Sequence, residues 1–124
     1  MTDISSNIEL MKSTIESIID QNKGHDIVTF DVQNKTIIAK HIIIASGDSS
    51  RHVKALAEHV IKNLKQYDKI SVEGMDEGNW VVLSFQDIMV HIFRPEVREY
   101  YKIEELFCDP NGPPIVIPVR DTGV

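Results

Sequence analysis

Residues 80–93 (WVVLSFQDIMVHIF) carry the pattern that most constrains the fold of this chain. Two six-residue runs rich in Val, Ile and Phe flank Gln86-Asp87, which predicts a β-hairpin that turns at these two residues. Because successive side chains of a strand point to opposite faces, each run divides into two sets. One set is uniformly apolar and is expected to pack under helices: Val81, Leu83, Phe85, Ile88, Val90 and Ile92.

The opposite face of the predicted hairpin is chemically mixed. Tryptophan, methionine and histidine on an open sheet face are typical of a protein interface, and tryptophan is strongly enriched in binding hot spots. The alternative is that Trp80 only covers the sheet's edge with its ring half buried, and the residues alone leave both interpretations open. The set is Trp80, Val82, Ser84, Met89, His91 and Phe93, and Ser71 and Glu73 of the preceding predicted strand continue the same face.

Two helices are predicted from apolar residues at helical spacing, over residues 6–22 and from Ser49 or Ser50 to about Gln66. Ser6 with Glu9 three residues later predicts a capping box, and Gly24 is expected to end the first helix. The apolar stripes comprise Ile8, Met11, Ile15, Ile18 and Ile19, and then Val53, Leu56, Ala57, Val60, Ile61 and Leu64. Outside the second stripe lie Arg51, Lys54, Glu58, Lys62 and Lys65.

The remaining segments predict strands and one short helix. Strands are expected at Ile27–Val32, within Thr36–Ala45 and at Lys69–Gly74, with a turn at Asn34-Lys35, and Pro95 is expected to begin a short helix. The unbroken Ile42-Ile43-Ile44 indicates a central strand covered on both faces. Its connection through the second helix to Lys69–Gly74 predicts a right-handed parallel crossover. The order favours an α/β fold, a mixed, mostly five-stranded sheet with helices packed on one face.

Composition limits the domain organisation and the class of protein. A chain of 124 residues holds one domain, expected at 1–107, followed by a proline-rich extended or disordered tail at 108–124. The single Cys108 excludes an intramolecular disulfide. The N-terminus lacks targeting-signal character and the longest apolar run is far shorter than a membrane span, so a soluble, cytoplasmic protein is expected. The formal charge of −6 disfavours nucleic-acid binding and favours a basic protein partner.

The common catalytic patterns are missing from the sequence. No two acidic residues are separated by one position, so no strand offers the same-face carboxylate pair that holds magnesium in a nucleotidyl or phosphoryl transferase. The five histidines show no zinc-ligand spacing with each other or with Cys108. Gly47–Arg51 joins a strand to a helix and could hold an anion on free backbone N–H groups. A nucleotide-binding or nucleotidyltransferase-like enzyme using this turn is therefore the alternative function, although the turn matches neither glycine-rich phosphate motif.

Several separate motifs, in the right order, resemble the ribosomal silencing factor (Iojap-like) family over roughly residues 6–107. They are Ile43–Ala57, Val72–Gly74, Trp80, Asp87–Phe93, Pro95–Tyr101 and Glu105–Phe107. The resemblance implies a nucleotidyltransferase-like fold that has lost catalysis, with no cofactor or metal. It also implies binding to the fourteenth protein of the large ribosomal subunit, where it blocks docking of the small subunit and lowers translation when nutrients are scarce. Relatives in organelles assist assembly of the large subunit.

The resemblance also implies partner-binding residues. The family's tryptophan, turn aspartate and strand histidine fall on Trp80, Asp87 and His91, and the hairpin face adds Glu73, Val82 and Met89. A homodimer through the same apolar face is a further expectation. The chain departs from the family pattern at three places: Lys40-His41 replaces Asp-Tyr, Ser84 stands where Asp is frequent, and Gln86 replaces a turn glycine. The last departure predicts a different turn geometry.

Overall fold

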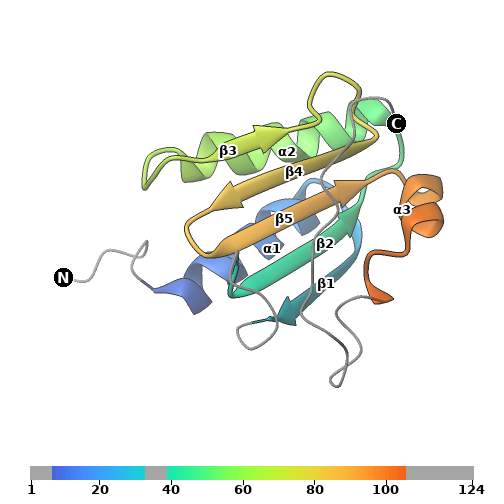
Figure 1. Cartoon of the computed structure of the whole chain (residues 1–124). Helices are drawn as coiled ribbons and strands as arrows, with labels where there is room; N and C mark the ends of the chain where they lie inside the picture. Colours follow the sequence, from blue (N-terminus) through green and yellow to red (C-terminus); the bar gives the residue numbers. More distant parts are fainter. Residues whose placement is uncertain (1–6, 33–38, 106–124) are drawn as a thin grey trace.

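The protein is an α/β domain built on a five-stranded mixed sheet with the strand order β1-β2-β5-β4-β3 (Figure 1). The computed structural model describes residues 7–32 and 39–105, so the predicted turn at Asn34-Lys35 and the predicted tail at 108–124 lie outside the described residues. The elements are α1 (Ile8–Gln21), β1 (His25–Asp31), β2 (His41–Ser46), α2 (Ser50–Leu64), β3 (Ser71–Glu73), β4 (Trp80–Phe85), β5 (Ile88–Phe93) and α3 (Pro95–Tyr101).

The pairing of the strands confirms the predicted hairpin and the predicted direction of the crossover. β4 and β5 are antiparallel around Gln86-Asp87, with Phe85 opposite Ile88. β2 pairs with β5 in parallel, and β3 pairs with β4 antiparallel. β3 therefore runs in the same direction as β2, with two strands between them, after the connection through α2. Every residue of β2 is buried, as its apolar run predicts.

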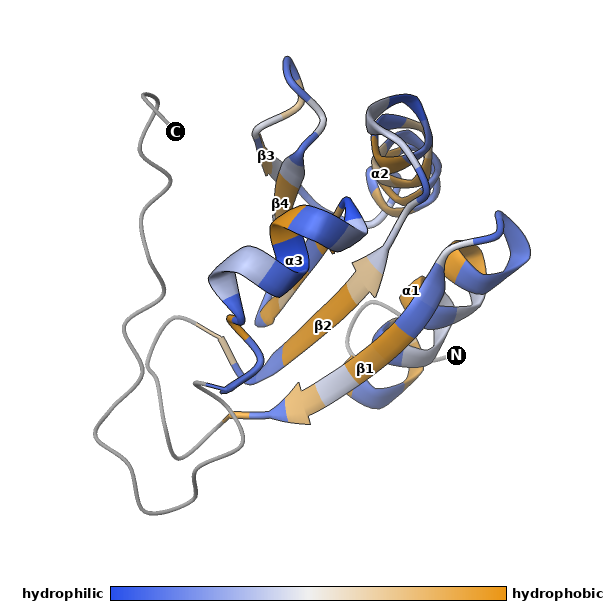
Figure 2. Cartoon of the chain, turned by 90° about the vertical axis from the view of Figure 1, so that its right-hand side faces the viewer, coloured by the Kyte–Doolittle hydropathy of each residue, from blue (hydrophilic) through white to orange (hydrophobic). Residues whose placement is uncertain are grey.

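The main core lies between the sheet and the two long helices. α1 and α2 pack side by side on one face of the sheet (Figure 2). Their apolar stripes pack against the uniformly apolar face of the hairpin, the one that includes Ile92. The buried members on the helices are Met11, Ile15, Ile18, Ile19, Val53, Leu56, Ala57, Val60 and Leu64. Helical and strand periodicities therefore converge on a single apolar layer. None of the helices in the described segments has the length and apolar character that spanning a bilayer requires.

The ends of the two long helices show which capping predictions hold. Ser49 caps α2, because its Oγ accepts a hydrogen bond from the His52 N–H at 3.1 Å. The predicted cap of α1 at Ser6 is wrong, since Asn7 is the N-cap and its side chain accepts from the Leu10 N–H. A short polar side chain at either position suits a cap, and the backbone geometry selects one of them.

The end of α1 also differs from the prediction. The helix ends at Gln21, and Lys23, not Gly24, takes the left-handed conformation with a φ of 72°. Gly24 is required for a different reason: a Cβ there would lie 2.3 Å from Ile19 Cγ2, because the chain passes closely over the last turn of the helix.

α3 packs on the sheet face opposite α1 and α2 (Figure 2). Pro95 occupies its first turn, as predicted. Val97 and Tyr101 of α3, together with Ile103, join a second core cluster around Trp80 and Phe93. The prediction that all helices share one face is therefore wrong for α3, because the hairpin carries apolar side chains on both faces and the second face also needs cover.

Candidate partner-binding surface

The strand register brings five of the six predicted partner-binding residues into one patch of the sheet. Glu73, Val82 and His91 form a row across β3, β4 and β5. Trp80 lies on the same face two residues before Val82, and Met89 two residues before His91. The sixth residue, Asp87, lies beyond the patch in the hairpin turn. The sequence-based grouping of the five on one face is thus reproduced by the geometry.

Trp80 and His91 form a buried hydrogen bond at the centre of this patch. Trp80 Nε1 donates to His91 Nδ1 at 2.9 Å, and the two residues are 6% and 0% exposed. The Trp80 ring stacks on Phe93, with centroids 4.8 Å apart, and Tyr101 lies against it at 4.9 Å. The expectation that the tryptophan and the histidine lie on an open face, or that the ring is half buried, is therefore wrong: Trp80 belongs to the second core cluster, and His91 is buried beside it.

Burial fixes the protonation state of His91. Removal from water lowers the pKa of His91 to about 4, so the ring is neutral near pH 7. Since Nδ1 accepts the Trp80 hydrogen bond, the proton resides on Nε2. That Nε2–H is buried and has no hydrogen-bond partner among the described residues. A polar donor left unpaired in this way is a cost to stability.

The accessible part of the patch lies toward β3 and toward the hairpin turn. Glu73 is exposed on the edge strand, Met89 is partly exposed on β5, and Asp87 is exposed in the turn. Val82, which is 5% exposed, lies between Glu73 and His91. The patch therefore offers carboxylates and a thioether to a partner, while its aromatic residues lie beneath.

The hairpin turn keeps a left-handed residue despite the lack of glycine. Gln86 has a φ of 53°, within the region that glycine favours, so the predicted change of turn geometry is wrong. The Asp87 carbonyl accepts hydrogen bonds from the Lys40 and His41 N–H groups, which ties the turn to the start of β2. The Lys40 ammonium lies 3.8 Å from the Asp87 carboxylate. The positive charge of Lys40 therefore offsets part of the negative charge of Asp87.

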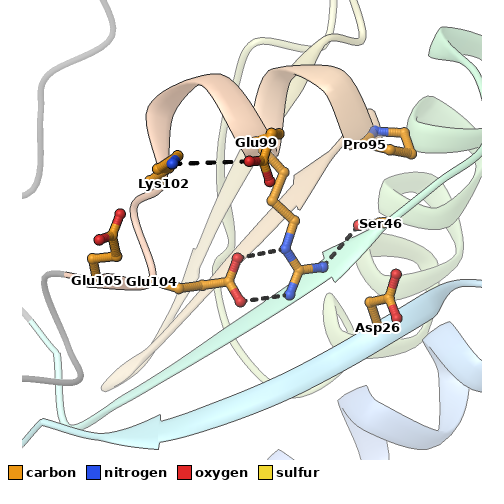
Figure 3. Close-up of a pocket in the computed structure, with 8 residues that line it drawn as sticks. Asp26, Ser46, Pro95, Glu99, Lys102, Glu104 and Glu105 are labelled. Carbon is orange, nitrogen blue, oxygen red and sulfur yellow. Dashed lines mark hydrogen bonds and ion pairs between the residues drawn. The ribbon is translucent and has the colours of Figure 1, made fainter.

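A polar cluster that the sequence did not identify fixes α3 to the sheet. The Arg98 guanidinium donates to both carboxylate oxygens of Glu104, at 2.6 and 2.9 Å, and to the Ser46 hydroxyl at 2.7 Å (Figure 3). The hydrogen bond from Arg98 lowers the pKa of Glu104. The i, i+4 spacing of Val97 and Tyr101 is the one sequence signal that indicates an inward face on this short helix.

A pocket of about 460 Å³ adjoins this cluster. Its lining residues are Asp26, Ser46, Pro95, Arg98, Glu99, Lys102, Glu104 and Glu105. The Arg98 guanidinium already has protein partners, and so does the Lys102 ammonium, which lies 3.9 Å from Glu99 (Figure 3). The pocket therefore resembles the space beneath a clamped helix more than a ligand cradle.

The Gly47–Arg51 turn, the basis of the alternative function, uses two of its five N–H groups internally. The Gly47 N–H donates to the Phe93 carbonyl, and the Asp48 N–H donates to His52 Nδ1. The His52 N–H is taken by the Ser49 cap. The N–H groups of Ser49, Ser50 and Arg51 have no acceptor in the part of the chain that the structure describes. Among the described residues, no three His, Cys, Asp or Glu side chains converge on a point where a metal ion could sit.

Comparison with known proteins identifies the group to which this arrangement belongs. The family model described as "Ribosomal silencing factor during starvation" matches residues 5–122. A ribosomal silencing factor of Chromobacterium violaceum is 42% identical over 101 residues, which cover 80% of this chain and 82% of that protein. A crystal structure from the same organism superposes with a TM-score of 0.80 at 35% identity and covers 89% and 93% of the two chains.

A more distant relative is the mouse protein named "Mitochondrial assembly of ribosomal large subunit protein 1". It is 28% identical over 96 residues, which cover 73% of this chain and 42% of that protein. A crystal structure from Bacillus halodurans superposes with a TM-score of 0.70 at 26% identity, over 90% of this chain and 100% of that chain.

Proposed function

Because the chain belongs to the ribosomal silencing factor family, whose members are non-enzymatic ribosome-binding regulators of translation, we propose that it binds the large ribosomal subunit through that subunit's fourteenth protein. Binding blocks docking of the small subunit and represses translation under nutrient limitation. The observation that carries the proposal is the family match over residues 5–122. Steric block requires only affinity for an exposed surface.

The patch on β3, β4 and β5 is the proposed contact. Glu73 and Asp87 present carboxylates, which complement a basic partner, and Met89 supplies adaptable apolar contact. Val82 and the buried pair of Trp80 and His91 shape the patch from beneath. In this proposal Trp80 acts mainly by positioning, because 6% exposure leaves it little area for direct contact. The same patch is the proposed surface for a homodimer.

The test is sedimentation of ribosomal subunits through sucrose gradients in the presence of the purified protein. The patch variants are Glu73→Lys and Asp87→Lys. Asp20→Lys is the matched control, because Asp20 is exposed on α1, across the sheet from the patch, and the charge changes by the same amount. Trp80→Ala is unsuitable, since truncating a buried aromatic ring typically costs about 3–5 kcal/mol of stability.

We expect the wild type and Asp20→Lys to sediment with the large subunit and to reduce joined ribosomes, while the patch variants do so weakly. Wild-type protein that stays at the top of the gradient with joining intact would refute the function. Patch variants that match Asp20→Lys would leave the function standing and move the contact elsewhere. The name of the mouse relative also supports a proposed role in large-subunit biogenesis, which would appear as loss of mature large subunits in cells lacking the protein.

A further inference from the structure

The outer face of α2 carries a cationic stripe that the proposed function does not use. Four of the six Lys and Arg side chains without an ion pair in the described segments lie on α2 or at its C-cap. They are Arg51, Lys54, Lys62 and Lys65, and the other two are Lys23 and Lys69. Each of the remaining cations in those segments has a carboxylate partner within 4 Å. The unpaired positive charge of this acidic protein is therefore concentrated on one helix.

The stripe is narrow and continuous. At about 100° per residue, Arg51, Lys54, Glu58, Lys62 and Lys65 fall within about 80° of the helix circumference, roughly opposite the buried residues. From Arg51 to Lys65 the stripe extends about 20 Å along the helix axis. Glu58 is the one carboxylate within it, so the formal charge of the stripe is +4 from the cations and −1 from Glu58.

The surface along the stripe is hollowed. A shallow groove of about 530 Å³ is lined by Arg51, Lys54, Ala55, Glu58, His59 and Lys62. The aliphatic stem of Lys54 lies against Gly78, where an added Cβ would approach Lys54 Cε to 2.8 Å and the Ser50 carbonyl oxygen to 2.7 Å. The loop after β3 thus packs against the aliphatic stem of Lys54.

From this charge, spacing and shape we infer that the outer face of α2 binds the phosphate backbone of RNA in the large ribosomal subunit. A row of cations without internal partners can release counterions from a line of phosphates, and it needs no base contact to do so. The inference rests on the proposed function, since it adds a second contact to the same subunit. α2 lies behind β3 and β4 (Figure 1), on the sheet face opposite Glu73, so the stripe would be a contact separate from the patch.

The test is the salt dependence of binding to purified large subunits, compared with binding to the isolated fourteenth protein. The stripe variant is Arg51→Gln with Lys62→Gln, and its matched control is Lys23→Gln with Lys69→Gln. All four side chains are exposed and both double variants change the net charge equally. Circular dichroism checks that each is folded. A further variant, Glu58→Gln, removes the carboxylate from the stripe and changes the charge in the opposite sense.

We expect the stripe variant to bind large subunits more weakly and with a log–log salt slope lower by about two, one for each lost phosphate contact. Its affinity for the isolated fourteenth protein should equal that of the wild type, and Glu58→Gln should bind subunits more tightly. An unchanged slope, or an equal loss of affinity for the isolated protein, would overturn the RNA contact and leave the proposed function intact. Wild-type protein that binds neither subunits nor the isolated protein would overturn both.

Discussion

Trp80 Nε1 donates a hydrogen bond to His91 Nδ1 at 2.9 Å, between neighbouring strands and out of contact with bulk water. The bond joins His91 to Trp80, which is a member of the second core cluster. It fixes the orientation of the imidazole and determines which nitrogen carries the proton. The two residues therefore act as one unit in the patch that we propose as the partner-binding surface.

A double-mutant cycle measures that unit. Trp80→Phe leaves the buried Nδ1 of His91 without its donor and should lower the free energy of unfolding by about 1–3 kcal/mol. His91→Leu removes the other partner, and the double variant should be less destabilised than the sum of the single variants by about 1 kcal/mol. Urea denaturation of the four proteins gives the coupling energy. Strict additivity would show that the hydrogen bond contributes nothing net.

The free energy of unfolding should fall as the pH is lowered, because His91 is buried as the neutral imidazole in the folded protein. Its pKa is about 4 when folded and near 6.5 when unfolded, so between these values the unfolded chain binds more protons. The contribution of His91 to the free energy of unfolding is therefore fully present above pH 6.5 and declines toward pH 4. The loss is on the order of 3 kcal/mol. The measurement is urea denaturation at a series of pH values.

His91→Asn is the control for that pH dependence, because its amide oxygen can accept from Trp80 but its side chain does not titrate. The difference between wild type and His91→Asn isolates this histidine from His25, whose pKa is raised chiefly by its hydrogen bond with Asp26 and which acts in the opposite sense. Equal slopes of stability against pH in the two proteins would contradict a neutral buried His91.

Replacing Gln86 in the hairpin turn by glycine should stabilise the protein. A non-glycine residue in the left-handed region costs roughly 1–2 kcal/mol, and glycine loses part of that gain through the entropy of the unfolded chain. Gln86→Gly should thus raise the free energy of unfolding by about 0.5–1 kcal/mol. Asp87→Gly is the control, since Asp87 lacks a positive φ, and it should be destabilising. The prediction fails if thermal denaturation ranks the two variants in the reverse order.

The clamp between Arg98 and Glu104 should hold α3 over the sheet. Glu104→Gln removes the charge from a bidentate pair whose side chains are 11% and 31% exposed, and should cost about 1 kcal/mol. Glu99→Gln is the matched control, because its pair with Lys102 spans 3.9 Å at the surface and should contribute little.

Tryptophan fluorescence can report on the clamp, because Trp80 is the only tryptophan. It belongs to the second core cluster, against which α3 packs. In Glu104→Gln the emission should shift to the red at lower urea concentration than in Glu99→Gln. Superimposable urea curves for the two variants would show that the clamp does not hold α3.

Local pattern was sufficient to predict much of the fold. The alternation in β4 and β5 identified the buried set at every position, and the helical stripes of α1 and α2 identified the residues that meet it. Caps were predicted less well, because Ser6 and Asn7 have similar capping chemistry and the choice depends on where the chain enters the helix. The clamp could not be predicted, since Arg98 and Ser46 are 52 residues apart.

The sequence by itself determined which residues share a face of the sheet, because strand and helix periodicities are local properties of the chain. It also determined the family, through motifs that remain readable without coordinates. Only the tertiary structure decided which members of a face are buried and which are accessible. Tyr101 of α3 lies against Trp80, and both Trp80 and His91 are buried, while Glu73 and Asp87 are exposed and Met89 is partly exposed. That division depends on contacts between distant segments, and periodicity along the chain contains no information about them.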